Sequence, residues 1–347
     1  GSLEHFSPMK EKSLGICSCV MGIFCNYFHL ILLDRGIRAG SKHESHCKYC
    51  QKCSHRARFY PSRHKSNIKK QFEKIIITFA EIFQQRLQMN TYYIIMAAMA
   101  VMAVIVFVAL FFFKAGYGYL STSNWGPKIG NKTAWVLMEA PAFCFMLYYT
   151  IEFAVSGVET GNSKAVLFIM AGFYLLHYFQ RSFIFPLMMR GKSTMPVAIM
   201  LMGLVFNTLN AYLIGGWLYG EAPSGMYLTE WLWSPQFIIG TILFFAGMGI
   251  NLHSDHVIRN LRQPGDTKHY IPRKGFYKYV TSANYFGEFT EWIGYAILTW
   301  SPAGLLFAVW TFANLGPRAK ALTGKYEQEF GEEYTKLNKK HIIPFIW

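Results

Sequence analysis

The fold is decided by residues 251–292, which read NLHSDHVIRNLRQPGDTKHYIPRKGFYKYVTSANYFGEFTEW. They follow one apolar run and precede another, yet they are rich in Arg, Lys, His, Asp and Glu. A bilayer does not solvate such a density of polar groups, so the stretch lies at a membrane surface or lines a cavity. Five polar residues stand at or inside the edges of the apolar runs, where such side chains usually face a pocket: Asn251, His253, Asp255, Asn284 and Glu288. We therefore expect a cavity, and the alternative is a plain loop between two membrane helices.

The composition is that of a polytopic membrane protein. Of 347 residues, 52% are hydrophobic, 17% are aromatic and 15% are charged, which is too apolar for a soluble protein. The net charge is +15, but 13 Lys and Arg against 4 Asp and Glu fall within residues 34–86, so much of the excess belongs to one segment. The other positive charges lie in loops, where they set topology and contact anionic headgroups. We therefore expect membrane lipids, and no nucleic acid, as partners.

Apolar runs long enough to cross a bilayer recur along most of the chain. They lie near residues 92–113, 134–152, 165–187, 196–218 and 235–252. A last apolar region, 286–315, is too long for one helix and is interrupted at Ser301-Pro302, so it is better interpreted as two. The sequence thus predicts an all-α membrane domain of seven transmembrane helices over residues 92–347.

Residues 1–91 form a basic extension of different character. The run at 14–33 is long enough to span a bilayer, but it contains Asn26 and His29, so spanning and surface packing are equally open. Apolar residues at three- and four-residue spacing over 68–87 predict an amphipathic helix, suited to a membrane surface or to a groove in a protein. We expect protein partners, where there are any, to bind through this extension.

Six of the seven Cys residues lie in the first 53 residues, with Cys144 alone in an apolar run. The spacing of Cys47, Cys50 and Cys53, followed by His55, could supply four ligands to Zn²⁺ or part of an iron–sulfur site. No second Cys/His pair follows at finger-like distance. A solvated basic loop is therefore the alternative to a zinc site.

Loop charge favours a cytosolic C-terminus, because the basic loops and the C-terminal tail hold most of the Lys and Arg of the predicted membrane domain. The basic extension would then lie on the far side, unless residues 14–33 also span. A membrane whose inner side is an organelle matrix would resolve this conflict as well. We expect an integral membrane protein of the endoplasmic reticulum, with the mitochondrial inner membrane as the alternative.

Five blocks resemble the steroid 5-alpha-reductase family (3-oxo-5-alpha-steroid 4-dehydrogenases). They are GYG at 116–118, AWVLMEAPAF at 134–143, LHYFQRSF at 176–183, GMGINLHSDHVIRNLRQPG at 247–265 and YVTSANYFGEFTEWIGYA at 279–296. The ending EEYTKLNKKHIIPFIW is similar as well, so the resemblance covers nearly all of residues 92–347. It implies a seven-helix membrane enzyme of steroid and lipid metabolism that reduces the C=C bond of a 3-oxo-Δ4 steroid or a similar lipid enone with NADPH.

The resemblance implies that Glu139 and Tyr178 hold the substrate ketone. Hydride addition to the β-carbon of an enone places negative charge on the ketone oxygen, and a buried Tyr hydroxyl can donate to that oxygen. A neighbouring Glu can orient the phenol. The structural alternatives are a polar residue near a helix entrance for Glu139 and an interfacial aromatic anchor for Tyr178.

The resemblance also implies a set of NADPH contacts: Tyr117, Asn251, Asp255, Arg262, Asn284, Glu288, Arg318 and Tyr326. Spacing supports part of this set. One face of a continuous helix would present four residues at intervals of four, four and three: Asn251, Asp255, Arg259 and Arg262. Arg suits a pyrophosphate or a 2′-phosphate because its fork binds phosphate oxygens bidentately. No G-x-G-x-x-G motif follows a strand, so we expect the cofactor among the helices and no Rossmann domain.

Three features depart from the family pattern. Met138 and Tyr270 stand where animal members usually carry Gln and Arg, and the residues after Arg318, AKALTGKY, contain no His. The long extension has no counterpart in a typical member. These departures leave a second hypothesis open, in which the chain is an accessory subunit of a larger membrane complex, such as a mitochondrial inner-membrane assembly, that keeps the reductase fold with weak or no activity.

Overall fold

A computed structural model of the chain describes residues 62–113, 120, 126–191, 193–263, 266 and 268–347. The chain divides into two compact units, Gly1–Glu81 and Ile82–Trp347. The predicted helix at 14–33, the Cys/His segment and Tyr117 lie outside the described residues. The predicted helix at 68–87 is confirmed, because it lies within α3, Ser62–Phe112. Its role at a membrane or in a protein groove stays a prediction.

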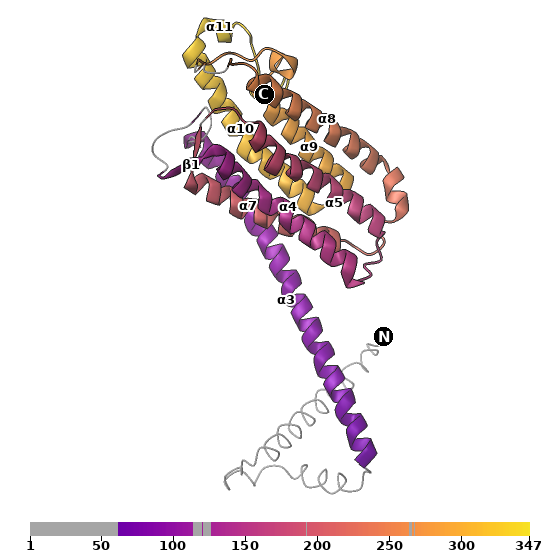
Figure 1. The fold of residues 1–347 in the computed structure, drawn as a ribbon. Helices are drawn as coiled ribbons and strands as arrows, with labels where there is room; N and C mark the ends of the chain where they lie inside the picture. Colours follow the sequence, from indigo (N-terminus) through magenta and orange to yellow (C-terminus); the bar gives the residue numbers. More distant parts are fainter. Residues whose placement is uncertain (1–61, 114–119, 121–125, 192, 264–265, 267) are drawn as a thin grey trace, which may run out of the picture. The chain divides into compact units, whose positions relative to one another are not determined.

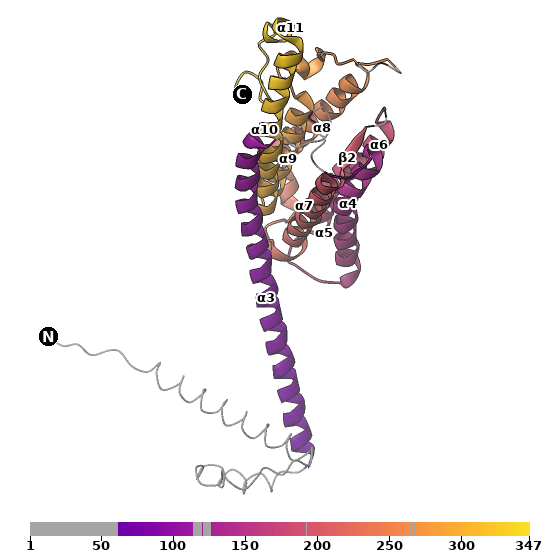
Figure 2. The ribbon, with the colours of Figure 1, turned by 90° about the vertical axis from the view of Figure 1, so that its left-hand side faces the viewer.

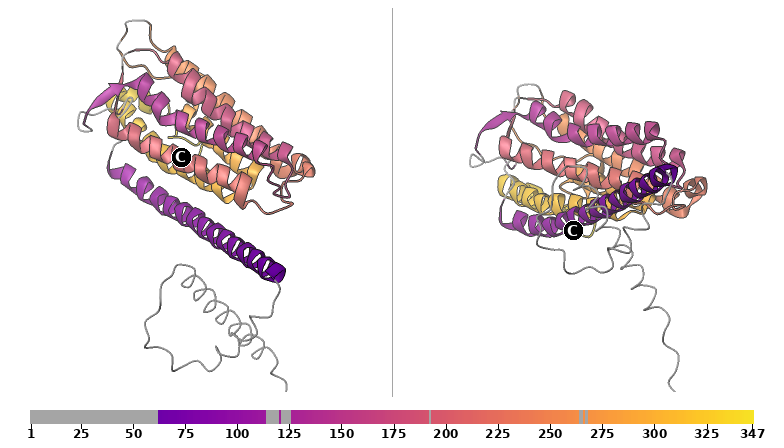
Figure 3. Two further views of the ribbon diagram at one scale, coloured as in Figure 1. Left: turned by 60° about the horizontal axis from the view of Figure 1, so that its bottom comes forward. Right: turned by 90° about the horizontal axis from the view of Figure 1, so that it is seen from below.

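The second unit is mostly helical (Figure 1). After α3 come α4 (Asn131–Ser156), α5 (Lys164–Phe179), the π-helix η3 (Gln180–Ile184), α6 (Phe185–Met188), α7 (Val197–Gly216), the π-helix η4 (Trp217–Glu221), the 3-10 helix η5 (Thr229–Trp233), α8 (Pro235–Arg259), the 3-10 helix η6 (Gly275–Lys278), α9 (Ala283–Thr299), α10 (Pro302–Phe330) and α11 (Glu332–Thr335). Two short antiparallel strands, β1 (Lys128–Gly130) and β2 (Thr194–Pro196), pair Lys128 with Pro196. The views in Figure 3 show the long helices of this unit side by side.

Four of the described helices are long and apolar enough to cross a membrane: Thr91–Phe112, Asn131–Ser156, Val197–Glu221 and Pro235–Arg259. The all-α class and the membrane character are therefore supported, whereas the predicted count of seven spans is not confirmed. Helices α5 and α9 have only 16 and 17 residues, which is short for a full span.

The predicted break at Ser301-Pro302 is confirmed. Helix α9 ends at Thr299, and α10 begins at Pro302, whose missing N–H is tolerated at the first helical position. The Ser301 hydroxyl accepts a hydrogen bond of 2.9 Å from the Gly304 amide and so caps α10. The break lets the chain reverse, and the C-terminal segment then returns to the start of α9, where Thr281 N donates to Lys340 O at 2.8 Å. Figure 2 shows α11 and the C-terminus at the end of the bundle where α8 also ends.

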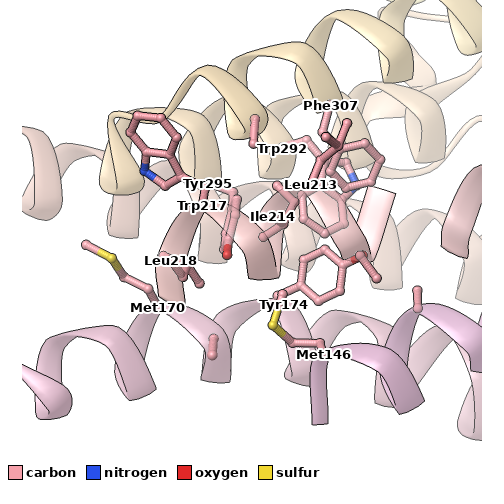
Figure 4. Close-up of a cluster of buried hydrophobic side chains, with 14 of the residues drawn as sticks. Met146, Met170, Tyr174, Leu213, Ile214, Trp217, Leu218, Trp292, Tyr295 and Phe307 are labelled. Carbon is pink, nitrogen blue, oxygen red and sulfur yellow. The ribbon is translucent and has the colours of Figure 1, made fainter. Parts of the chain in front are cut away.

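The core of this unit is aromatic and gathers side chains from α4, α5, α7, α9 and α10 (Figure 4). Its largest fully buried member is Trp292, whose ring centroid lies 4.1 Å from that of Phe307 and 5.8 Å from that of Tyr174. Each such ring buries a large apolar area and adds a preferred edge or tilted contact. This cluster fixes α5 against α9 and thereby positions the polar residues at their ends.

Candidate active site

Glycines hold α8 and α9 in backbone contact next to the site. A Cβ on Gly247 would overlap the backbone N of Glu291, and it would lie 2.6 Å from the Gly287 O. The relation is reciprocal, because a Cβ on Gly287 would overlap the backbone of Asn251. A second reciprocal pair, Gly240 and Gly294, repeats the contact further along the helices. Small residues permit such close approach, so the polar side chains that follow on each helix are brought within hydrogen-bonding distance.

The two predicted four-residue steps, Asn251/Asp255 and Asn284/Glu288, do face each other. Asn251 Nδ2 donates to the Asn284 O at 3.0 Å and to Glu288 Oε2 at 3.4 Å. Asn284 Nδ2 donates to Asp255 Oδ1 at 3.3 Å. All four side chains use an amide or carboxylate group across the helix pair, so the paired ends of α8 and α9 form one polar wall.

Arg181, which the sequence analysis did not single out, joins this wall to α5. Its guanidinium donates to Asp255 Oδ2 at 3.2 Å and to Glu288 Oε2 at 3.5 Å, and its side chain is 10% exposed. It also lies over the Phe185 ring, with the guanidinium carbon 4.4 Å from the ring centroid. Arg181 belongs to η3, whose extra residue per turn changes the direction of the side chains that follow Tyr178. The sequence did offer one indication of a role for Arg181, namely its position in the LHYFQRSF block, which resembles the family.

A cavity of about 770 Å³ opens beside this wall. Its lining includes Phe185, Met189, Arg190, Gly191, Ser193, Asp255, Ile258, Arg259, Arg262, Gln263, Asp266 and Asn284. Three guanidinium groups and two carboxylates therefore meet at one opening. This size is within the range of small-molecule and cofactor sites.

The predicted helix face is wrong at its far end. Helix α8 ends at Arg259, where Asn260 adopts φ −102° and ψ 10°, so Arg262 lies in the turn that follows and not on the helix. Arg262 nevertheless lines the cavity together with Asp255 and Asn284. Arg262 was therefore predicted correctly to line the same cavity as Asp255, but the turn after α8 places it there and not a continuation of the helix.

Glu139 and Tyr178 are joined through a third side chain, Asn207 of α7. The Tyr178 hydroxyl donates to Asn207 Oδ1 at 3.0 Å, and Asn207 Nδ2 donates to Glu139 Oε2 at 3.2 Å and to the Met138 O at 2.8 Å. Tyr178 and Asn207 are buried and Glu139 is half-buried. The sequence analysis missed Asn207, although an Asn in the middle of the apolar run 196–218 was a signal that it faces other protein groups.

A buried His–Glu pair lies behind Tyr178. His177 Nδ1 and Glu291 Oε1 are 2.8 Å apart, and both side chains are buried. The His177 ring packs edge-on against Trp292 and Tyr178, at centroid distances of 4.5 and 5.1 Å. The pair therefore connects α5 to α9 directly beneath the Tyr178 ring.

Four of the predicted cofactor residues that the structure describes are absent from the lining of the cavity given above: Asn251, Glu288, Arg318 and Tyr326. Asn251 and Glu288 bond to each other in the polar wall, whereas the other two contact groups elsewhere. Arg318 donates to the Tyr285 hydroxyl at 3.2 Å and is buried in α10. Tyr326 stacks on Phe330 and Tyr334, with ring centroids 5.7 and 5.3 Å away. Their roles toward a cofactor stay predictions.

Tyr270, which stands where animal members of the family usually carry Arg, lies in a segment with several polar contacts. The Tyr270 hydroxyl donates to Asp266 Oδ2 at 2.8 Å, and Arg273 pairs with Glu333 at 2.7 Å. Lys339 Nζ donates to the Pro272 O at 2.7 Å, and burial, aided by the charge of Arg273, lowers the pKa of Lys339 from 10.5 to about 8. These contacts fasten the segment before α9 to the C-terminal part of the chain.

No group of three or more His, Cys, Asp or Glu residues that could hold a metal ion occurs among the residues that the structure describes. The predicted zinc ligands Cys47, Cys50, Cys53 and His55 lie outside those residues, so the zinc site has no support and stays a prediction.

With the site's geometry established, comparisons identify its relatives. A family model described as 3-oxo-5-alpha-steroid 4-dehydrogenase matches residues 193–347. The chain is 42% identical over 232 residues to 3-oxo-5-alpha-steroid 4-dehydrogenase 1 of Macaca fascicularis, which is 67% of this chain and 84% of that protein. The chain belongs to the steroid 5-alpha-reductase family. A plant member of the family, steroid 5-alpha-reductase DET2 of Solanum lycopersicum, is 38% identical over 262 residues, covering 74% of this chain and 98% of that protein. The resemblance noted in the sequence is thus confirmed.

Proposed function

We propose that the chain reduces the C=C bond of a 3-oxo-Δ4 steroid, or of a similar lipid enone, with NADPH inside the membrane. The observation that carries the proposal is the junction at Asn207. One amide there holds a buried hydroxyl, that of Tyr178, and a carboxylate, that of Glu139. The name of the family and of its relatives, 3-oxo-5-alpha-steroid 4-dehydrogenase, supports the same substrate class.

The proposed chemistry follows from where charge develops. When a hydride adds to the β-carbon of an enone, the electron pair of the C=C bond moves toward the ketone oxygen, which becomes negative. Tyr178 lies in a buried, water-poor position, and its O–H would donate to that oxygen as an enol forms. The enol oxygen then returns its proton to the Tyr178 phenolate while the α-carbon takes up a proton from solvent water, which gives the saturated ketone. Glu139 would hold the Asn207 amide and, through it, keep the phenol aimed at the substrate.

The residues at the cavity fit NADPH by their chemistry. NADPH carries a pyrophosphate and a 2′-phosphate, and Arg190, Arg259 and Arg262 place three guanidinium groups at one opening. Asp255 and Asn284 on the polar wall offer an acceptor and an amide for the sugar hydroxyls or the nicotinamide. When bound, NADPH supplies the hydride. Arg181, through Asp255 and Glu288, would keep that wall against α5, next to Tyr178.

We infer that the chain crosses the membrane seven times, in the four helices that are long and apolar enough and in three more. The seven are the part of α3 from Thr91, then α4, α5 with its continuation to Met188, α7, α8, α9 and α10. The helix from α5 through η3 to α6 is continuous over residues 164–188, which is long enough to cross. The endoplasmic reticulum, the mitochondrial inner membrane and the accessory-subunit role stay alternatives from the sequence. No contact of the described residues favours one of them.

The proposal is tested by product analysis with the full chain in membranes, using progesterone, a 3-oxo-Δ4 steroid, with NADPH or NADH. We expect NADPH-dependent formation of the saturated 3-ketone. Tyr178→Phe should lower kcat by about 10²–10⁴-fold, the usual contribution of a positioned proton donor. Tyr295→Phe is the matched control, because the Tyr295 hydroxyl is buried and has no hydrogen-bond partner among the residues that the structure describes. Absence of turnover in the unsubstituted protein, or equal rates for Tyr178→Phe and the control, would contradict the proposal.

A further inference from the structure

The orientation of the Asn207 amide is fixed by its surroundings. The Met138 O is a backbone carbonyl and can only accept, so the group that faces it at 2.8 Å must be the Asn207 NH₂. The same NH₂ reaches Glu139 Oε2 at 3.2 Å. The amide oxygen therefore faces Tyr178, whose hydroxyl has to act as the donor in the 3.0 Å contact.

Asn207 is only 4% exposed, so these bonds offset a substantial cost of burying the amide. Both N–H groups are used on α4, by Met138 and Glu139, which anchors the amide to that helix. The oxygen has two lone pairs, and Tyr178 occupies one of them. The NH₂ group of Asn207 is therefore held in place by α4 through Met138 and Glu139, whereas its oxygen is free to exchange the hydrogen bond from Tyr178.

We propose that Asn207 is the positioning residue of the enone-reducing site, an inference that rests on the proposed function. Its amide sets the separation of Glu139 and Tyr178, and it holds the phenolic hydrogen until a substrate ketone takes its place. When the ketone accepts the Tyr178 O–H, the hydroxyl turns away from Asn207 Oδ1, while the amide stays bonded to Met138 and Glu139. The phenol thus moves about a fixed partner, which lowers the reorganisation needed at the reacting oxygen.

The geometry also indicates where a replacement amide could be supplied. The Met138 side chain packs on Gly203 of α7, one turn before Asn207, since a Cβ on Gly203 would overlap Met138 Cγ. Met138 itself offers no N–H donor in its side chain. A Gln at this position would carry its amide along the same α4–α7 contact toward the space that Asn207 fills.

The experiment compares kcat and KM of four forms of the full chain with progesterone and NADPH: unsubstituted, Asn207→Leu, Met138→Gln/Asn207→Leu and Thr208→Val. Thr208 is the control on the same helix, because its hydroxyl donates back to the Leu204 O, within α7 itself, at 2.9 Å. We expect Asn207→Leu to lower kcat by about 10- to 100-fold with little change in the KM for NADPH. The added Gln should recover kcat by about fivefold or more, and Thr208→Val should match the unsubstituted protein.

An active unsubstituted protein whose Asn207→Leu form keeps kcat within about twofold would overturn the inference while leaving the proposed function intact. A double variant no faster than Asn207→Leu would overturn it too, since a role in packing alone is not restored by moving the amide. If Asn207→Leu does not accumulate in membranes, Asn207→Asp carries the same expectation, because it keeps an acceptor for Tyr178 and loses the donor to Glu139. No turnover by the unsubstituted protein would contradict the proposed function itself.

Discussion

His177 Nδ1 lies 2.8 Å from Glu291 Oε1, and this pair is buried beneath the Tyr178 and Trp292 rings. Removing one partner of such a pair leaves a polar or charged group without compensation. We therefore expect Glu291→Ala to lower the free energy of unfolding by about 3–5 kcal/mol, measured in mild detergent by urea or thermal unfolding. The double variant His177→Phe/Glu291→Leu should lose much less, because two apolar side chains replace the pair. Additive losses from the two single substitutions would show that the groups are not coupled.

The glycine contact between α8 and α9 predicts a different effect for two nearby glycines. Gly247→Ala places a methyl group into the backbone of α9, so we expect a loss of about 1–3 kcal/mol and a raised KM for NADPH as the polar wall is forced apart. Gly249→Ala is the matched control on the same helix, because a Cβ there meets nothing within 4 Å. We expect it to be neutral or slightly stabilising. Thermal unfolding and NADPH titration check both, and equal behaviour of the two variants would refute the close contact.

Arg181 should not be replaceable by lysine. Its planar fork reaches Asp255 and Glu288 together, and a lysine ammonium is a point charge that cannot reproduce this geometry or the stacking on Phe185. We expect Arg181→Lys to weaken NADPH binding by about tenfold, equivalent to about 1.4 kcal/mol. The control is Arg273→Lys, on an exposed arginine that pairs with Glu333 and is absent from the lining of the cavity, so its NADPH affinity should be unchanged. The measurement is cofactor titration of the purified protein, and unchanged affinity in Arg181→Lys would exclude a bridging role.

The lowered pKa of Lys339 predicts that the free energy of unfolding rises with pH between about 8 and 10.5. Its folded-state pKa, about 8, lies below the unfolded value of 10.5, so between these values the unfolded chain binds more protons. Stability therefore rises with pH in this window, and below about pH 8 the burial penalty on the charged form is fully present. The effect should be on the order of 1 kcal/mol after allowing for solvent screening of a partly exposed group. Lys339→Met should remove this rise, as seen by comparing unfolding of the two proteins at about pH 7.5 and about pH 9.5.

How far the site could be predicted depends on how local its geometry is. The pairing of Asn251 with Asn284 was predictable because four-residue steps at the ends of two apolar runs place such groups on one helix face. Asn207 was not, since only the packing of α7 on α4 and α5 brings it to Glu139 and Tyr178, which lie 68 and 29 residues away in the sequence. The break at Ser301-Pro302 was predictable because proline restricts the local backbone.

Other features depend on backbone details that no spacing rule contains. The π-helix at Gln180–Ile184 forms a wider turn with i→i+5 hydrogen bonds, and no sequence signal in QRSFI predicts it. The end of α8 at Arg259 removed Arg262 from the predicted helix face, although the turn kept its side chain at the cavity. Family resemblance suggested the proposed roles of Glu139 and Tyr178, whereas the structure showed that Asn207 joins them.

The backbone contact at Gly247 and Gly287 has a mechanical consequence for access to the cavity. Helices α8 and α9 touch at these glycines without intervening side chains, so their contact offers no flexible side chains that could rearrange when a ligand enters. We therefore expect the polar wall on α8 and α9 to stay in place when a ligand enters. Another part of the lining comes from Phe185, Met189 and Arg190, in α6 and just after its end at Met188. We expect this second part of the lining to move instead. Entry and release of a bulky dinucleotide would then depend on the end of α6 and not on the polar wall that would hold the dinucleotide.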